Sequence, residues 1–175
     1  PMSKYGYLRE ALVARGLVRP GGYLAPSAIG ARPVAAVHAA DYVERVFSLT
    51  LEREEVRRIG LPGNARVARR ARLATAGTLL ATWMAFEHGI AVNSAGGSHH
   101  AGPEGGAGFC VFNDVAVAAR AVLDGGRAPV LVVDCDVHQG DGTARIFAGE
   151  PGVFTFSIHA ERNYPAEKPL SDIDL

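Results

Sequence analysis

Hydrophobic residues recur along the chain at two spacings, which divide it into expected helices and strands. Apolar positions three and four apart predict helices over 3–16, 38–50, around 54–58, and over 64–89, 113–126 and 140–149. A continuous apolar run occupies 129–134, and such runs are typical of parallel strands buried on both faces. Residues 153–159 are a second expected buried strand. A shorter apolar run, 90–94, is a third expected strand. The order of strands and helices predicts an α/β domain with a parallel sheet.

Capping and turn-forming residues mark the boundaries of these elements. Ser3, Asn64 and Asn113 stand where helix N-caps are expected, and Gly89 suits the end of the longest helix. The second half of that helix is apolar nearly all round, so we expect it to be buried. Pro and Gly residues predict loops over 19–33 and 95–108.

Composition and charge narrow the class of protein. The 175 residues are 48% hydrophobic, which fits one globular domain with a core. Eighteen basic and eighteen acidic side chains give a formal net charge of zero, so the basic excess of a nucleic-acid-binding protein is missing. Arginines cluster in the longest helix, and we expect them on its solvated face: Arg66, Arg69, Arg70 and Arg72.

Cysteine usage and hydropathy favour a cytoplasmic protein. The two cysteines, Cys110 and Cys135, are far apart, so a disulfide framework is not expected. No signal-peptide pattern is visible, and no apolar run reaches the roughly 18 residues that a membrane span needs. We therefore expect no membrane partner.

Acidic residues and a histidine follow the apolar run 129–134. Asp134, Asp136 and His138 are two positions apart, so in extended chain their side chains point the same way. They stand at the carboxyl end of an expected parallel strand, where α/β sheets place ligand sites. Asp and His are good ligands for a zinc-like cation, which would offset the cost of carboxylates beside a buried strand. Taken singly, Asp134 and Asp141 also fit loop or helix caps; the whole D-x-D-x-H-x-x-D cluster favours a metal site.

Two adjacent histidines, His99 and His100, lie within the Gly-rich loop 95–108. A lone histidine is usually structural, but a pair that a loop aims into one pocket favours general acid/base chemistry. Each imidazole then needs a partner that fixes its tautomer and holds its charge. Asp134 and Asp141 are candidate partners, which leaves Asp136 and His138 for the metal; spacing alone does not decide this division.

The two motifs together resemble the zinc-dependent histone deacetylase family of the arginase/deacetylase superfamily, in its bacterial and class IV-like branch. The matching segments are "GGSHHAGPEGGAGFCVFND" and "VVDCDVHQGDGTARIF". The segments "PMSKYGYLREAL", "VHAADYVERV" and "SIHAERNYPAEKPLSDIDL" resemble other parts of the same branch. The resemblance covers essentially the whole chain but only the first part of a family domain.

The resemblance implies a fold, an activity and a set of site residues. The fold is a three-layer α/β/α sandwich with a mainly parallel sheet, and the activity is hydrolysis of acetylated lysine side chains or related acetylated amines. Asp136 and His138 would bind zinc, and His99 and His100 would activate water and protonate the leaving amine, held by Asp134 and Asp141. The implied substrate channel contains Gly108, Phe109 and Tyr164. The family's structural potassium site would correspond to Ser157 and to main-chain carbonyls of the turn that contains Asp134, Asp136 and His138.

The chain departs from the family pattern in its later part. The family's third ligand, an aspartate, and its oxyanion-stabilising tyrosine lie beyond the stretch that this chain matches. Asp172 and Asp174 match a different stretch, and we expect them to be surface or loop residues. The expectation is therefore one incomplete domain over 1–175, with weak metal binding and little activity by itself.

Other functions fit some of the same residues. A binuclear manganese ureohydrolase shares the fold, but it prefers D-x-H-x-D at this strand end, whereas this chain has D-x-D-x-H. A non-catalytic ligand-binding or scaffold protein would keep the fold without turnover, and the intact histidine and aspartate set argues against it. Within the deacylase hypothesis, proteins, acetylated polyamines, acetoin-related targets and longer acyl chains remain alternative substrates.

Overall fold

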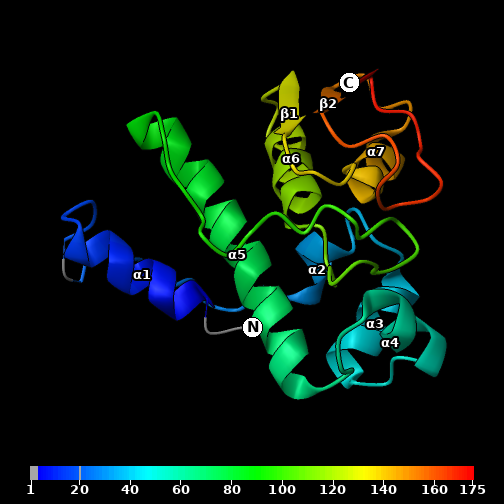
Figure 1. Ribbon diagram of the computed structural model, residues 1–175, viewed down its shortest axis with the longest axis horizontal. Coiled ribbons are helices and arrows are strands. Elements are labelled where there is room, and N and C mark those ends of the chain that lie inside the picture. The colour runs from blue at the N-terminus through cyan, green and yellow to red at the C-terminus, as the bar shows by residue number, and fades with distance from the viewer. Residues whose placement is uncertain (1–3, 20) are drawn as a thin grey trace.

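The computed structural model describes residues 4–19 and 21–175 (Figure 1). Its helices are α1 (Lys4–Ala14), α2 (Ala31–Val34), α3 (Ala40–Ser48), α4 (Arg53–Ile59), α5 (Ala65–His88), α6 (Asp114–Asp124) and α7 (Asp141–Phe147). Its strands are β1 (Val130–Asp134), β2 (Val153–Ser157) and β3 (Ile173–Asp174). Each predicted helix has a counterpart, whereas α2 lies at the edge of the expected loop 19–33. The predicted cap Ser3 lies outside the described residues.

The helix ends follow from local capping. Asn64 begins α5 by accepting a hydrogen bond from the Val67 N–H at 3.0 Å, and Gly89 ends that helix as predicted. Glu52 and Glu55 form a capping box at the first turn of α4: the side chain of each residue accepts a hydrogen bond from the backbone N–H of the other. Asn113 caps α6 by accepting from the backbone N–H of its third residue.

The three strands form a parallel sheet in the order β1-β2-β3. Asp134 at the end of β1 pairs with Ser157 at the end of β2, so polar residues of both strands meet at the carboxyl edge. The expectation that both faces of β1 are buried is wrong. Leu131 and Val133 are 62% and 55% exposed, because α6 covers the other face and no described element covers this one.

The expected strand 90–94 is not formed in the described chain. A hollow of about 770 Å³ lies between this segment, α5, α6 and the start of β1. No strand is therefore near enough to pair with residues 90–94, and Ile90 and Val92 are exposed. The second half of α5 borders the same hollow, so the expectation that it is buried is also wrong; Trp83 and Phe86 are 40% and 49% exposed.

The arginine cluster of α5 is only partly solvated. Arg70 lies over the Tyr5 ring and donates a hydrogen bond to its hydroxyl, while Arg72 lies over the ring of Phe47. The other two arginines of the cluster are exposed, as predicted. Half of this cluster therefore connects helices to each other instead of facing solvent.

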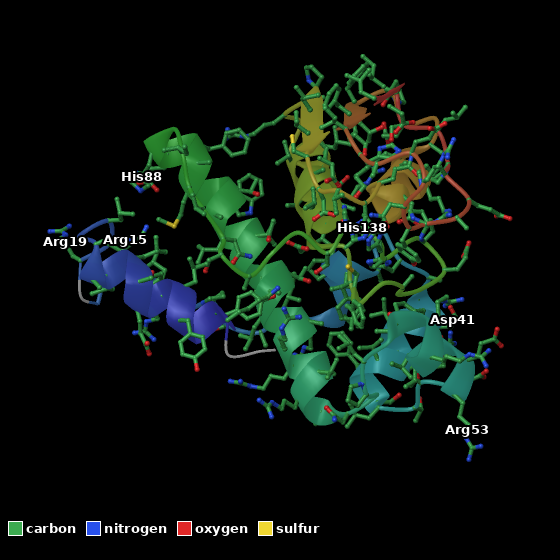
Figure 2. The ribbon with its side chains drawn as sticks, in the orientation of Figure 1. Arg15, Arg19, Asp41, Arg53, His88 and His138 are labelled. Carbon is green, nitrogen blue, oxygen red and sulfur yellow. The ribbon has the colours of Figure 1, made fainter. Side chains whose placement is uncertain are left out.

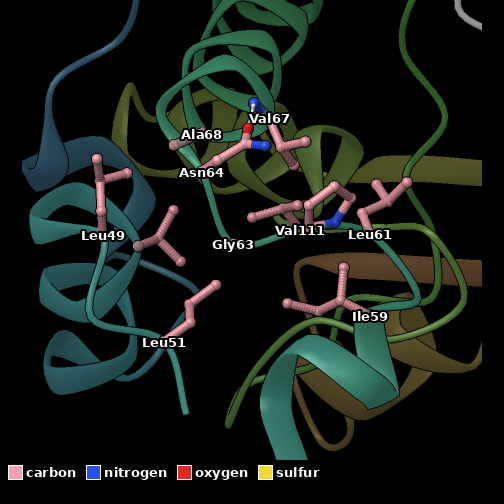
Figure 3. A pocket seen from close by; sticks show the side chains of 11 residues that line it. Leu49, Leu51, Ile59, Leu61, Gly63, Asn64, Val67, Ala68 and Val111 are labelled. Carbon is pink, nitrogen blue, oxygen red and sulfur yellow. Dashed lines mark hydrogen bonds between the residues drawn. The ribbon is translucent and has the colours of Figure 1, made fainter. Parts of the chain in front are cut away.

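The hydrophobic core lies where α2, α3 and α6 meet the first half of α5. Tyr42 and Phe112 are its largest fully buried aromatic residues, and their rings pack edge to face. A cavity of about 10 Å³ remains beside Ile59 and Val111, with room for at most one water molecule (Figure 3). The core thus joins α3 and α4 to the loop after the tandem histidines.

Within the described ranges, no helix has the length and hydropathy needed to cross a membrane.

Candidate active site

The candidate active site lies at the carboxyl end of β1. Asp134 is the last residue of this strand, residues 135–140 form the turn that follows, and Asp141 begins α7. Figure 2 shows His138 at the junction between β1 and α7. The tandem histidines reach this junction from the Gly-rich loop between α5 and α6, so the site is assembled from two separate segments of the chain.

Each tandem histidine is paired with one aspartate. The Nδ1 atom of His99 lies 2.6 Å from Oδ2 of Asp134, and Nδ1 of His100 lies 2.6 Å from Oδ1 of Asp141. The two imidazole rings are 4.0 Å apart, centroid to centroid. The division of partners that spacing left open is thus resolved geometrically. Because an ionised carboxylate only accepts, each Nδ1 carries its hydrogen and each Nε2 is left to exchange protons.

The electrostatic environments of the two pairs differ. Burial disfavours a charged His99, but the hydrogen bond to Asp134 and the nearby negative charges outweigh it and raise the pKa of His99. Burial likewise opposes ionisation of Asp134, yet the bonds from His99 and from the Asp136 N–H, together with the nearby histidines, outweigh it and lower the pKa of that carboxyl. The other carboxylate, Asp141, is shared between His100 and the guanidinium of Arg145. Arg145 therefore compensates the buried charge of Asp141 from the next turn of α7.

Two glycines make these pairings sterically possible. A Cβ atom at Gly140 would lie 2.3 Å from Oδ2 of Asp134, the oxygen that faces His99. A Cβ atom at Gly142 would lie 2.4 Å from the carbonyl oxygen of Ala101, directly after the tandem pair. The G-D-G sequence around Asp141 is therefore a close-packing requirement, because any side chain there would push the two segments apart.

Asp136 and His138 lie next to the histidine pairs. Oδ1 of Asp136 lies 3.1 Å from Nδ1 of His138, and the His138 ring is 5.7 Å from that of His100. Both side chains are partly exposed, at 51% and 38%. The described residues contain no group of three or more His, Cys, Asp or Glu side chains placed to hold a metal ion. Ser157 is buried at the register position of Asp134, and its hydroxyl bonds to Nδ1 of His159 at 3.0 Å.

Two of the three predicted channel residues, Gly108 and Tyr164, lie against the His100 ring. The Tyr164 ring stands edge-on to it at 4.8 Å, and a Cβ atom at Gly108 would collide with the same imidazole. Phe109 is 68% exposed and has a φ of 65°, which is unfavourable for a bulky residue. Its backbone N–H donates to the Ile59 carbonyl at 2.7 Å, which holds this conformation. Gly108 and Tyr164 thus border the His100 ring, whereas the Phe109 ring lies beside Gly60 at the end of α4.

Three buried residues hold the histidine loop, and none was predicted in this role: Asn113 was expected only as a helix cap, and Asp114 and His38 were not singled out. Asp114 accepts hydrogen bonds from the backbone N–H groups of residues 97 and 98, immediately before His99. Asn113 donates to the Ala101 carbonyl at 3.1 Å, immediately after the pair. His38 contacts the same loop further on. The N-cap signal located Asn113 in the sequence, whereas no local pattern indicated the role of His38.

The late aspartates make structural contacts, and the partner of Asp174 is Gln139, the residue after His138. Asp172 is exposed outside the helices and strands, as predicted, and it accepts from the N–H and hydroxyl of Thr155 at 2.6 and 2.8 Å. Asp174 is half-buried in β3 and accepts from Nε2 of Gln139 at 3.0 Å. These bonds attach the last segment of the chain to β2 and to the turn that carries His138.

Comparisons with known proteins place this geometry in a family. The family described as "Histone deacetylase domain" matches residues 2–174. An uncharacterized protein of Picosynechococcus sp. is 46% identical over 176 residues, covering 100% of this chain and 59% of that protein. The chloroplastic histone deacetylase 14 of Arabidopsis thaliana is 45% identical over 76 residues, covering 43% of this chain and 18% of the plant protein.

Solved structures show the same fold. An HDAC homolog from Aquifex aeolicus superimposes with a TM-score of 0.79 at 23% identity, covering 94% of this chain and 50% of that one. This likeness confirms the predicted arginase/deacetylase fold with its parallel sheet. The chain spans about three fifths of the cyanobacterial relative and half of the solved homolog. Because the family match runs through nearly every residue of the chain, the protein belongs to the histone deacetylase domain family.

Proposed function

We propose that this chain carries the proton-transfer half of the active site of a zinc-dependent deacylase that removes acetyl groups from amines. The observation that carries the proposal is the pair of His–Asp hydrogen bonds of 2.6 Å with imidazole rings 4.0 Å apart. Two oriented imidazoles side by side are suited to acid/base work on one substrate, because one accepts a proton while the other donates one. The family membership supports the same reaction class.

We further propose that Asp136 and His138 hold the zinc ion. A carboxylate and an imidazole are both ordinary zinc ligands, and their facing atoms lie 3.1 Å apart beside the His100 ring. When bound, zinc would supply a Lewis acid that polarises an acyl carbonyl and activates water. For a structural potassium ion we propose Ser157 and main-chain carbonyls of Asp134, Asp136 and His138, because the strand register pairs Ser157 with Asp134.

The chain's own residues would divide the proton transfers between them. His100, with Nδ1 fixed by Asp141, presents Nε2 as the base that takes a proton from water. Asp134 raises the pKa of His99 and so favours its charged form, which suits His99 to stabilise negative charge and to return a proton to the departing amine. Arg145 contacts the other oxygen of the Asp141 carboxylate and so helps to orient Oδ1 toward His100.

Gly108, Phe109 and Tyr164 would bind the acylated side chain. The exposed Phe109 ring and the edge of Tyr164 offer apolar surface on which the methylene stem of a lysine can pack. The proposed substrates are acetyl-lysine in a protein or peptide and, as the alternative, an acetylated small amine such as a polyamine. Cys110 and Cys135 are both free, which supports a reducing compartment such as the cytoplasm.

The test uses the protein as its gene encodes it, loaded with zinc or treated with a chelator. Acetate release from an acetyl-lysine peptide and from acetylated polyamines would be followed for the wild type, for His100→Ala and for the exposed control His88→Ala. We expect chelator-sensitive hydrolysis that falls about 10²- to 10⁴-fold in His100→Ala and is retained in the control. Absence of turnover on both substrate classes by the zinc-loaded protein would refute the deacetylase proposal. Absence of zinc binding would refute the ligand assignment of Asp136 and His138.

A further inference from the structure

His38 is a buried histidine outside the proposed catalytic set. It lies directly before α3 and is 4% exposed, packed between the rings of Tyr42 and Phe112. Its Nδ1 atom is 2.7 Å from the carbonyl oxygen of Gly102, and its Nε2 atom is 2.9 Å from the backbone nitrogen of Asn113. One side chain therefore bridges the two ends of the segment that follows the tandem histidines.

The two partners of His38 fix its protonation state. A backbone carbonyl only accepts and a backbone N–H only donates, so Nδ1 must carry a hydrogen and Nε2 must be bare. Burial acts in the same direction, because it lowers the pKa of His38 to about 4. The ring is thus a neutral link with one donor and one acceptor, and both of its hydrogen bonds are made in the core.

The bridged backbone positions connect directly to the histidine pairs. Gly102 is two residues after His100. Asn113 extends the link, because its side chain donates to the Ala101 carbonyl at 3.1 Å and to the Thr143 hydroxyl at 3.0 Å. Thr143 belongs to the first turn of α7, which also carries Asp141, and its backbone N–H donates to the His99 carbonyl at 3.2 Å. The backbone of the tandem histidines and the helix that carries one of their partners are therefore fixed by one network.

We propose that His38 is a positioning residue, which holds the backbone from Gly102 to Asn113 so that His99 and His100 meet Asp134 and Asp141. Its effect on turnover rests on the proposed deacylase function, whereas its effect on the two hydrogen bonds does not. Loss of the ring's bonds leaves the Gly102 carbonyl and the Asn113 N–H buried without partners, which favours displacement of the loop. A displacement of about 1 Å at a catalytic group is enough to lower a rate by roughly 100-fold.

The test compares His38→Phe, which keeps a ring without either hydrogen bond, with Val43→Ala, which removes buried apolar volume from the same region of α3. Proton NMR would follow the imidazole Nδ1–H signals of His99 and His100, which hydrogen bonding to the carboxylates moves downfield. We expect His38→Phe to lose or shift both signals well below its melting temperature, and Val43→Ala to keep them. Where substrate turnover is measured, kcat should fall roughly 10- to 100-fold in His38→Phe with little change in KM.

The outcomes separate this inference from the proposed function. Unchanged Nδ1–H signals in folded His38→Phe would overturn it and leave His38 as a residue of the core alone. If His38→Phe does not fold, His38→Asn is measured in the same way and judged by the same criterion. The shorter amide can place its NH2 donor toward Gly102, but it does not extend to the position where Nε2 accepts from Asn113. A wild type with both signals but no deacetylase activity would refute the proposed function, and the signals of the variants would still decide the role of His38.

Discussion

Lowering the pH from 7.5 to 5.0 should destabilise the folded protein through His38. In the fold, Nε2 of this ring accepts a hydrogen bond from the Asn113 N–H, so adding a proton there would set two donors against each other. Burial lowers the pKa of His38 from 6.5 to about 4. On acidification, His38 is therefore protonated near pH 6.5 in the unfolded chain but only near pH 4 in the folded protein.

The sign and size of the effect follow from this difference. Because the folded pKa is the lower one, the stabilisation is complete above pH 6.5 and is lost as the pH falls toward 4. At pH 5.0 the unfolded histidine is almost fully protonated and the folded one about one tenth, which corresponds to a loss of about 2 kcal/mol relative to pH 7.5. Tyr42, whose ring packs against His38, has its pKa raised by burial and remains neutral throughout this range.

Urea unfolding at pH 7.5 and 5.0 measures this loss when the wild type is compared with His38→Gln. The glutamine has no titrating group, and its amide oxygen can accept from the Asn113 N–H. Other titrating groups are shared by the two proteins, so their contributions to the pH dependence cancel in the comparison. We expect the unfolding free energy of the wild type to fall by about 2 kcal/mol more than that of the variant. Equal losses in the two proteins would refute the assignment of a buried, neutral His38.

Three further substitutions test the architecture around the site. Asn113→Ala should lower the unfolding free energy by about 2–4 kcal/mol, because it removes a helix cap and leaves buried carbonyls unpaired. Asn64→Ala, at the exposed start of α5, should lower it by only about 1 kcal/mol. Equal losses for the two variants in chemical denaturation would contradict this expectation. Gly142→Ala should destabilise by about 1–3 kcal/mol through its backbone collision, and Gly30→Ala, which meets open space, should be near neutral in thermal unfolding. Phe109→Gly relieves the positive φ, so it should leave the unfolding free energy unchanged or raise it by about 1 kcal/mol. The same variant should raise KM for an acetyl-lysine peptide. A loss of stability with an unchanged KM would show that the Phe109 ring serves only in packing.

Local signals in the sequence predicted the elements that local forces determine. The bounds of α5 follow from Asn64 and Gly89, because a cap acts on the first or last turn whatever the rest of the fold does. The expected extended alignment of Asp134, Asp136 and His138 is wrong, because β1 ends at Asp134 and residues 135–140 form a turn in which the Asp136 N–H donates to Oδ1 of Asp134 at 3.0 Å. The family resemblance then identified the tandem histidines and their partners, and the structure brings the same pairs together.

The predictions that were wrong concern surroundings, which local patterns do not contain. An apolar run such as that of β1 shows that its residues prefer burial, but burial also requires an element that covers each face, and Leu131 and Val133 lack one within the described residues. The run 90–94 has the composition of a strand, but a strand exists only through hydrogen bonds to a neighbour, and here a hollow separates it from β1.

The tandem histidines show why a motif can reveal the residues of a candidate site without revealing the distant residues that hold them in place. Adjacent histidines on one loop need a backbone that glycine-rich sequence does not fix by itself, since each flexible residue costs conformational entropy to order. The restraint comes from residues far away in the sequence: His38 is 64 positions from Gly102 and 75 from Asn113. Such contacts have no period or spacing, because only the packing of α3 against the loop creates them. The residues of the proposed chemistry can therefore be recognised from a sequence motif, whereas the residues that position them can be identified only from the folded structure.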